Sequence, residues 1–193
     1  MKKILIIYGH PVKDTFSEEL LESYNKGALT SGAEVKSLIL NKMVFELNLS
    51  EGYRVDKEME ADIQKAQEYI LWADHLLFIY PNWWGTYPAL VKGFIDRTFL
   101  PGFAFKYKNG HTHPEKLLKG KTARIMVSMD NTVFYYRYIL NGPGNHAMKK
   151  ATLKFCGISP VKITMIGSIR KSTKKRRQKW LNKTYKLGIA DAT

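Results

Sequence analysis

The sequence predicts an α/β protein in which five parallel strands form one doubly wound sheet with helices on both faces. Short, nearly continuous apolar runs alternate with longer segments of helical period, and this pattern is typical of parallel strands covered from both sides. No repeat, low-complexity tract or long linker interrupts the alternation. The 193 residues, 45% of them hydrophobic and 25% charged, therefore predict a single domain spanning residues 1–193.

Five apolar runs predict the strands, and a common order for a five-stranded sheet of this kind is 2-1-3-4-5. The first run, KILIIY, has apolar residues at consecutive positions, as a strand buried on both faces does. The second run alternates between apolar and polar residues. In chain order the predicted strands are Lys3–Tyr8, Glu34–Leu40, His75–Tyr80, Thr122–Ser128 and Val161–Ile166.

Helical spacing predicts five further segments. In the second of them Met59, Ile63, Ala66 and Ile70 recur every three or four residues, so they share one face. The third begins with Pro88, a residue favoured in the first turn of a helix. In chain order the predicted helices are Ser17–Ser31, Asp56–Trp72, Pro88–Phe99, Met148–Cys156 and Thr173–Leu187.

Composition and missing motifs exclude several classes of protein. No apolar run approaches the roughly 18–20 residues of a membrane-spanning helix, and the apolar start is too short for a signal peptide. We therefore expect a cytoplasmic protein, in which the single cysteine, Cys156, is a small core residue. G-x-G-x-x-G and the P-loop are absent. His111 and His113 lack a third ligand, so we predict no metal site.

Ligands of a doubly wound sheet bind at the carboxyl ends of its strands, so the loops after strands one, three and four are expected to be functional. In the first of these loops, Thr15-Phe16-Ser17-Glu18 matches the capping box that opens a helix. Free N–H groups at such a helix start attract an anion. The hydroxyls of Thr15 and Ser17, together with His10, add further donors. An ordinary helix cap is the alternative interpretation.

The loop after the third strand is unusually aromatic. It reads Pro81-Asn82-Trp83-Trp84-Gly85-Thr86-Tyr87-Pro88. Adjacent tryptophans between prolines cannot all point into the core. Their flat faces suit a planar ligand, and they suit a dimer interface equally well, so both interpretations stay open.

The loop after the fourth strand begins polar, becomes aromatic and ends in turn residues. It starts as Ser128-Met129-Asp130-Asn131, continues through Phe134-Tyr135-Tyr136 and reaches Asn141-Gly142-Pro143-Gly144-Asn145-His146. Such a loop supplies hydrogen bonds to the edge of a ring, with a tyrosine or a histidine above it. A surface loop with incidental aromatic residues is the alternative.

Together these segments resemble the NAD(P)H:quinone oxidoreductase family of flavodoxin-like flavoproteins. The resemblance spans most of the chain and is most specific in residues 81–97, where the aromatic loop, proline, Lys-Gly and Asp-Arg occur in the family's order. The other matching segments are Gly9-His10-Pro11 with Thr15-Phe16-Ser17, Leu100-Pro101-Gly102-Phe103-Ala104-Phe105 and Phe155-Cys156-Gly157. The resemblance implies a flavodoxin-like sheet that binds FMN or FAD non-covalently.

The resemblance also implies the roles of individual residues. Thr15, Phe16 and Ser17 would hold the flavin phosphate, with His10 beside it. Residues 81–85 and 128–131 would line the ring, although the second segment departs from the Thr-Thr-Gly-Gly of many relatives. The implied ring contacts are Pro81, Asn82, Trp83, Trp84, Gly85, Ser128, Met129, Asp130 and Asn131. The candidates for the catalytic residues near the acceptor are Tyr135, Tyr136 and His146.

The implied activity is ping-pong hydride transfer from NADH or NADPH, through the flavin, to a quinone or another small two-electron acceptor. The protein then supplies stacking, orientation and charge, while the cofactor supplies the chemistry. Family members are commonly homodimers with the site at the subunit boundary, which would use Phe103 and Phe105 as well as the tryptophans. An electron-transfer protein resembling flavodoxin is a rival interpretation, although flavodoxins are usually acidic.

The net charge of +14 is unevenly distributed. Residues 1–100 hold 11 Lys/Arg and 14 Asp/Glu, whereas residues 101–193 hold 20 and 3. The run Lys171–Lys179 places cations in the first turn of a helix, against the helix dipole. A regulatory module that binds nucleic acid, a membrane or another anionic partner through this helix is the alternative function. The favoured interpretation is a solvated charged face opposite the inward residues Trp180, Leu181 and Leu187.

Overall fold

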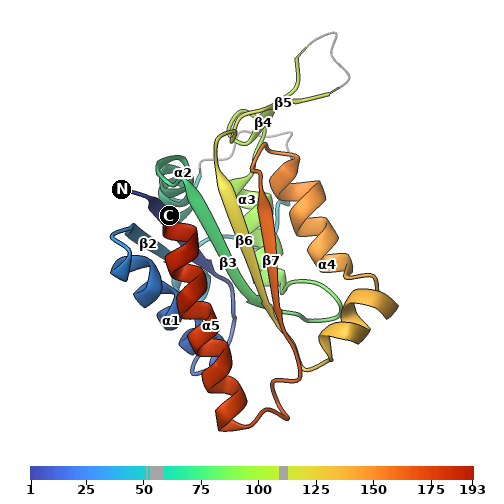
Figure 1. Cartoon of the computed structure of the whole chain (residues 1–193). Helices are drawn as coiled ribbons and strands as arrows, with labels where there is room; N and C mark the ends of the chain where they lie inside the picture. The colour runs from blue at the N-terminus through green and yellow to red at the C-terminus, as the bar shows by residue number, and fades with distance from the viewer. Residues whose placement is uncertain (51, 53–58, 109–112) are drawn as a thin grey trace.

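The computed structural model of the chain describes residues 1–50, 52, 59–108 and 113–193, and it contains the predicted sheet (Figure 1). Neighbouring strands are all parallel and follow the order β2-β1-β3-β6-β7. Counted along the chain this is 2-1-3-4-5, so the predicted α/β class and flavodoxin-like order are confirmed. The strands are β1 (Lys3–Tyr8), β2 (Glu34–Ile39), β3 (His75–Pro81), β6 (Thr122–Ser128) and β7 (Val161–Ile166).

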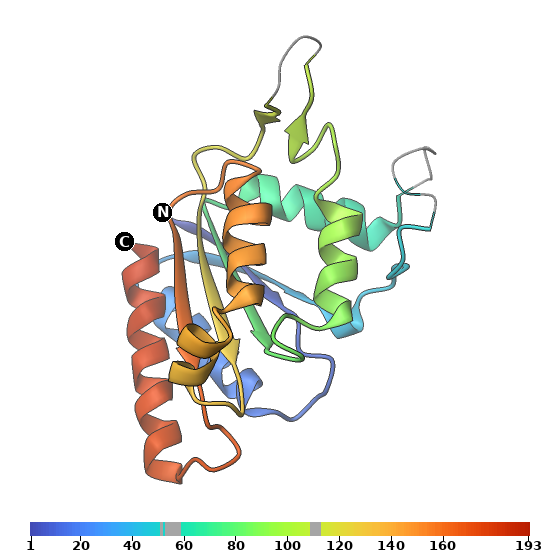
Figure 2. The same ribbon diagram turned by 90° about the vertical axis from the view of Figure 1, so that its right-hand side faces the viewer.

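Helices cover both faces of the sheet, as Figure 2 shows from the side. One face carries α1 (Phe16–Thr30) and α5 (Lys174–Ala192), and the other carries α2, α3 and the continuous helix formed by α4 and η3. Alternate residues of β1 serve the two layers: Ile4 and Ile6 pack under α1, whereas Leu5 and Ile7 pack in the opposite core. The helices of the second face are α2 (Ala61–Trp72), α3 (Ala89–Thr98), α4 (Pro143–His146) and the π-helix η3 (Ala147–Lys154).

Four smaller elements lie outside the five-stranded sheet and the helices that cover it. A two-stranded antiparallel hairpin projects from the end of the molecule where the sheet strands begin (Figures 1 and 2). Of the two histidines considered as metal ligands, His111 lies outside the described residues. In the part of the chain that the structure covers, no group of three potential metal ligands occurs. The smaller elements are η1 (Leu40–Lys42), β4 (Phe105–Lys106), β5 (Glu115–Lys116) and the π-helix η2 (Tyr135–Ile139).

The predicted helices differ from the observed ones mainly in their bounds. The helix predicted at Asp56–Trp72 is observed from Ala61, and residues 56–58 lie outside the described part. The helix predicted at Met148–Cys156 is largely a π-helix, in which the Thr152 hydroxyl donates to the carbonyl of Ala147 at 3.2 Å. The last helix continues five residues beyond Leu187 because its end carries a buried charge. Among the described residues no helix is long and apolar enough to span a bilayer.

Helices α1 and α5 touch backbone to backbone. A Cβ atom on Gly27 would lie 2.1 Å from the carbonyl oxygen of Tyr185, and one on Gly188 would lie 2.2 Å from that of Tyr24. Glycine at both positions therefore permits the close crossing that brings α5 over the sheet beside α1. The crossing seals the core that contains Phe16, together with Leu20 and Trp180.

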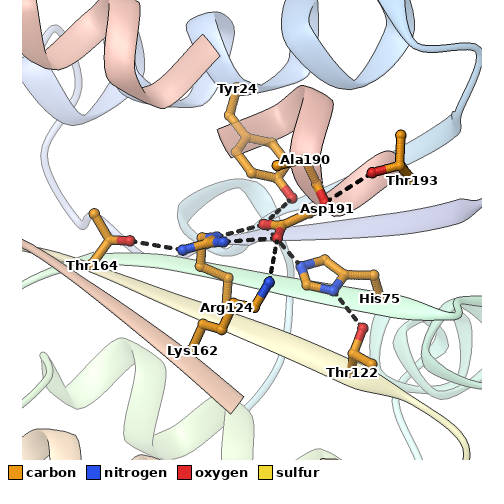
Figure 3. A network of polar contacts seen from close by, with 9 residues as sticks. All are labelled: Tyr24, His75, Thr122, Arg124, Lys162, Thr164, Ala190, Asp191 and Thr193. Atoms are coloured by element: carbon orange, nitrogen blue, oxygen red, sulfur yellow. Dashed lines mark hydrogen bonds and ion pairs between the residues drawn. The ribbon is translucent and has the colours of Figure 1, made fainter. Parts of the chain in front are cut away.

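A buried ionic network joins the carboxyl end of α5 to the amino ends of the strands (Figure 3). The Arg124 guanidinium donates two hydrogen bonds to the Asp191 carboxylate and a third to the Thr164 hydroxyl at 3.0 Å. The Tyr24 hydroxyl donates to the same carboxylate at 3.0 Å, and His75 Nε2 lies 3.4 Å from it. The side chains of His75, Arg124 and Asp191 are all at most 6% exposed.

The network holds Asp191 in its ionised form. Burial alone raises the pKa of this carboxyl group, but the hydrogen bonds and charge of Arg124, with His75 close by, outweigh burial and place the pKa far below its usual range. The pKa of Tyr24 is raised, first by burial and then by the negative charge of Asp191. His75 therefore belongs to a structural network.

Candidate active site

The three predicted loops meet at the carboxyl edge of the sheet. The Ser17 and Ser128 hydroxyls are 3.0 Å apart and share a hydrogen bond, although 111 positions separate them in the sequence. The backbone N–H of Asn82 donates to the carbonyl of Ser128 at 2.7 Å. These contacts join the loops after β1, β3 and β6 into one rim, which lies at the lower end of the sheet in Figure 2.

Two adjoining cavities open at this rim, and Asn82, Met129 and Asp130 line both. The first cavity has a volume of about 210 Å³, and the second has a volume of about 470 Å³. The first is lined by His10, Thr15, Phe16, Ser17, Pro81, Asn82, Trp83, Ser128, Met129, Asp130 and Ile169. The second is lined by Asn82, Trp84, Gly85, Met129, Asp130, Asn131, Tyr135, Leu140 and Pro143. Each of the residues predicted to contact a cofactor thus lines at least one cavity.

The start of α1 gives the first cavity its hydrogen-bond donors. Thr15 is the N-cap residue, and the Glu18 carboxylate accepts a hydrogen bond from its N–H at 3.3 Å, as the capping box predicts. The N–H groups of Phe16 and Ser17 come next, in the first turn, where a helix leaves its donors unbonded. An anion such as a phosphate group finds both these donors and the positive end of the helix dipole here.

His10 contributes a neutral imidazole to the same cavity. Burial is the main cause that lowers the pKa of His10. Its Nδ1 accepts a hydrogen bond from the N–H of Val12 at 3.1 Å, so the ring proton is assigned to Nε2. Beside it, the Tyr8 hydroxyl lies 3.1 Å from Thr15 Oγ1, and burial raises the pKa of Tyr8 to about 12. The groups aimed at an anion are therefore neutral donors and backbone amides.

A tight turn forms the wall of the second cavity. Trp83 and Thr86 exchange backbone hydrogen bonds of 2.8 and 3.0 Å, while Trp84 and Gly85 have φ values of 51° and 79°. Two central residues with positive φ define a type I′ turn. The Trp84 side chain is fully exposed and Trp83 is 43% exposed. The prediction that these rings do not all enter the core is thereby confirmed.

Asn82 leaves an acceptor free where the two cavities meet. Its Oδ1 is buried and has no hydrogen-bond partner among the described residues. A buried oxygen without a partner costs free energy, so it marks a position where a ligand N–H or O–H would fit. The resemblance implied that Asn82 contacts the ring through its backbone N–H. That N–H donates to the carbonyl of Ser128, so the group left free is the side-chain oxygen.

The three candidate catalytic residues occupy different positions. Tyr135 lines the second cavity. Tyr136 is 1% exposed, lines neither cavity and donates its hydroxyl to the carbonyl of Gly85 at 3.1 Å. His146 is exposed at the end of α4 and also lines neither cavity. The catalytic roles stay predictions, and the geometry favours Tyr135 for direct contact with a ligand.

The sequence missed the contribution of the loop after β7. Ile169 lines the first cavity, and its N–H donates to the carbonyl of Met129 at 3.3 Å. The N–H of Arg170 donates to Asp130 Oδ1 at 2.9 Å, and Arg170 Nη2 lies 3.4 Å from Oδ2. This loop follows a strand that ends at the same edge, so the topology rule itself would have identified it. Leu140 and Pro143, in the second cavity, carry no comparable signal.

Two arginines at the basic start of α5 make local contacts with neutral groups. The Arg176 guanidinium lies 4.9 Å from the centre of the Trp180 ring, and that of Arg177 lies 5.2 Å from the Phe16 ring. Arg177 Nε also donates to the Ser172 hydroxyl at 2.9 Å. Trp180, Leu181 and Leu187 pack inward against the core, as predicted. The favoured interpretation, a solvated charged face over an apolar one, agrees with this packing.

The fold, with two cavities at the carboxyl edge of its sheet, is that of a flavodoxin-like protein, and the chain belongs to that family. The family model, described as flavodoxin-like fold, matches residues 2–187.

Comparisons with individual proteins give more specific similarities than the family model does. The chain is 29% identical over 179 residues to an uncharacterized NAD(P)H oxidoreductase of Haemophilus influenzae, covering 90% of this chain and 88% of the relative. It is 26% identical over 181 residues to the human ribosyldihydronicotinamide dehydrogenase [quinone], covering 81% and 77%. The crystal structure of Smu.1420 from Streptococcus mutans UA159 superposes with a TM-score of 0.81 at 34% identity, covering 97% of this chain and 99% of that one.

Proposed function

We propose that this chain is a flavin-dependent oxidoreductase that uses NADH or NADPH to reduce a quinone or a similar small acceptor. The observation that carries the proposal is the pair of adjoining cavities, one lined by donors and the other by aromatic and amide groups. A flavin has the same division into an anionic tail and a planar ring. The name of the Haemophilus relative supports NADH or NADPH as the donor. The name of the human relative gives a ribosyldihydronicotinamide as donor and a quinone as acceptor, so it supports a reduced nicotinamide and the acceptor.

The residues present fit a flavin mononucleotide unit, whether it is FMN or part of FAD. In this proposal the N–H groups of Phe16 and Ser17, the hydroxyls of Thr15 and Ser17, and His10 Nε2–H hold the phosphate. Asn82 Oδ1, which is buried and unpartnered among the described residues, accepts a hydrogen bond from the cofactor. Trp83, Trp84 and the 128–131 segment lie along the ring and limit the access of water.

The bound flavin would supply ping-pong hydride transfer between the reduced nicotinamide and the acceptor. The protein orients both reactants, which bind one after the other in the second cavity. Trp84 offers an aromatic face there, and Tyr135 offers a hydroxyl at the ring edge. The basic second half of the chain favours phosphorylated substrates through its field, so NADPH is the proposed donor.

The first test is cofactor binding followed by turnover. Protein saturated with FMN or FAD and then desalted is expected to keep a flavin absorption spectrum, and mass analysis of the released cofactor identifies which flavin it is. The holoprotein is expected to oxidise NADPH only slowly until a quinone is added. Colourless desalted protein would remove the basis of the proposal. A yellow protein that passes electrons to no two-electron acceptor would instead support the alternative, an electron-transfer or regulatory module.

The proposal includes a homodimer whose interface adjoins the second cavity. Phe134, Ile139 and Leu140 are 66%, 59% and 38% exposed and lie in or beside η2, and Leu140 also lines the second cavity. Neighbouring apolar side chains of this size favour association. A second copy is the proposed occupant because burying this surface would also narrow the cavity.

The measurement for the dimer is molecular mass in solution by light scattering. The wild-type chain of 22.2 kDa is expected to scatter as two chains, and Ile139→Lys is expected to weaken association at least tenfold. Leu71→Lys is the matched control, because Leu71 is 57% exposed on α2, away from the site. A monomeric wild-type protein, or equal effects of the two substitutions, would exclude this interface.

A further inference from the structure

The backbone of the Trp84 turn is strained. In a type I′ turn both central residues need positive φ, which suits Asn, Asp and Gly. Trp84 occupies the first of these positions with φ 51°, where a bulky side chain is strongly disfavoured. Its ring is fully exposed, so packing of that ring within the chain does not offset the cost. Other contacts must therefore hold the turn in place.

A clamp on the carbonyl of Gly85 supplies these contacts. This oxygen accepts hydrogen bonds from the Tyr136 hydroxyl and from the N–H of Gly144, both at 3.1 Å. Gly144 packs directly on the turn, since a Cβ atom there would lie 2.6 Å from Thr86 Cα. Two backbone hydrogen bonds to residues on either side of η2 hold Tyr136 in place. The N–H of Tyr136 donates to the carbonyl of Thr132, and the N–H of Gly142 donates to the carbonyl of Tyr136. The turn is thus held from a different loop.

Tyr136 is poorly placed to exchange a proton with a substrate. It lines neither cavity and is 1% exposed, and its hydroxyl hydrogen already points at a backbone carbonyl. Burial also raises its pKa. Tyr135, the adjacent residue, lines the second cavity and is 44% exposed. The two tyrosines therefore differ in what they can reach.

We propose that Tyr136 is a positioning residue whose hydroxyl, by clamping the Gly85 carbonyl, holds the strained turn that keeps Trp84 at the wall of the second cavity. This inference rests on the proposed function for the identity of the ligand, but the clamp itself is a property of the protein without ligand. It assigns Tyr136 an effect on the binding of the acceptor and none on proton transfer.

The test compares Tyr136→Phe with Tyr138→Phe, the same substitution on the same π-helix, at a side chain that is 61% exposed. In the ligand-free protein the amide of Thr86, which donates to Trp83, is expected to exchange its hydrogen about three- to tenfold faster in Tyr136→Phe. In the flavin-loaded enzyme the KM for menadione is expected to rise about three- to tenfold. The kcat value is expected to stay within twofold, with an unchanged pH profile. Tyr138→Phe is expected to match the wild type throughout.

A double-mutant cycle isolates the strain. Trp84→Asn places a residue that tolerates positive φ at the strained position, so the turn needs the clamp less. In that background Tyr136→Phe is expected to change the exchange of the Thr86 amide less than twofold. Equal effects in both backgrounds would show that Tyr136 does not act by holding the strained turn.

Other outcomes overturn the inference separately from the proposed function. A 100-fold loss of kcat with a lost alkaline limb in the pH profile would identify Tyr136 as a proton donor. If Tyr136→Phe leaves both the exchange of the Thr86 amide and the KM unchanged, Tyr136 does not clamp the turn. A wild-type protein that binds no flavin would refute the proposed function, while the exchange measurement on the free protein would still decide about the clamp.

Discussion

Replacing Asp191 by alanine is expected to lower the free energy of unfolding at pH 7 by about 3–5 kcal/mol, because Arg124 would be left buried without its carboxylate. Tyr24 would lose its acceptor as well, and the end of α5 would lose its attachment to β6. Urea unfolding followed by circular dichroism measures this loss. Asp96→Ala is the control, since that carboxylate pairs with Lys92 on an exposed helix face and is expected to cost less than about 1 kcal/mol.

The pH dependence of stability provides an independent check of the Asp191 prediction. The pKa of Asp191 is far lower in the folded than in the unfolded chain, so its contribution is complete above the unfolded pKa of about 4. The contribution is then lost as pH falls toward the folded pKa. The difference in unfolding free energy between wild type and Asp191→Ala is therefore expected to be constant from pH 5 to 7 and to shrink below pH 4. A difference that grows toward low pH would contradict the assignment.

Ser17→Asp is expected to weaken flavin binding at least 100-fold. Ser17 lies in the first turn of α1 and is 3% exposed, so the new carboxylate would face the position proposed for the phosphate. Two like charges about 4 Å apart repel by about 4 kcal/mol at the effective dielectric of a protein surface. Titrating apoprotein into FMN or FAD and following the fluorescence of the flavin gives the Kd.

The matched control for Ser17→Asp is Ser37→Asp, an exposed position on the edge strand β2, away from both cavities. It adds the same charge and is expected to leave the Kd within twofold of the wild-type value. Circular dichroism checks that both variants keep the fold. If Ser17→Asp folds and binds flavin as tightly as Ser37→Asp, the phosphate does not lie at the start of α1.

The strands were predictable because apolar content changes abruptly at their ends. Three of the five predicted strands have the observed bounds, and Glu34–Leu40 and His75–Tyr80 differ from the observed strands by one residue each. The strands β4 and β5 were missed because two residues each give no periodicity. The π-helices were missed too, since their five-residue hydrogen bonds leave no clear signature in the sequence.

The sequence predicted which residues form the rim better than it predicted the role of each residue. Topology alone located the three loops, and the aromatic loop and capping box identified residues within them. The sequence could not distinguish the role of Tyr135 from that of Tyr136, because the two residues are adjacent. Tyr135 lines a cavity, whereas Tyr136 is buried against Gly85. That difference depends on the π-helical backbone. The contacts of Ile169 and Arg170 likewise follow from how the last loop folds back on the 128–131 segment.

The ionic network and the two cavities lie at opposite ends of the same strands. From Thr122 to Ser128 the strand β6 covers about 20 Å, so the buried charges are well removed from the rim. A chain organised in this way can exchange the residues that face its ligands without disturbing the charges that anchor its last helix. Directed evolution toward a new ligand would therefore begin at residues that line the second cavity, such as Leu140, Pro143 and Asn131, and would leave His75, Arg124 and Asp191 unchanged.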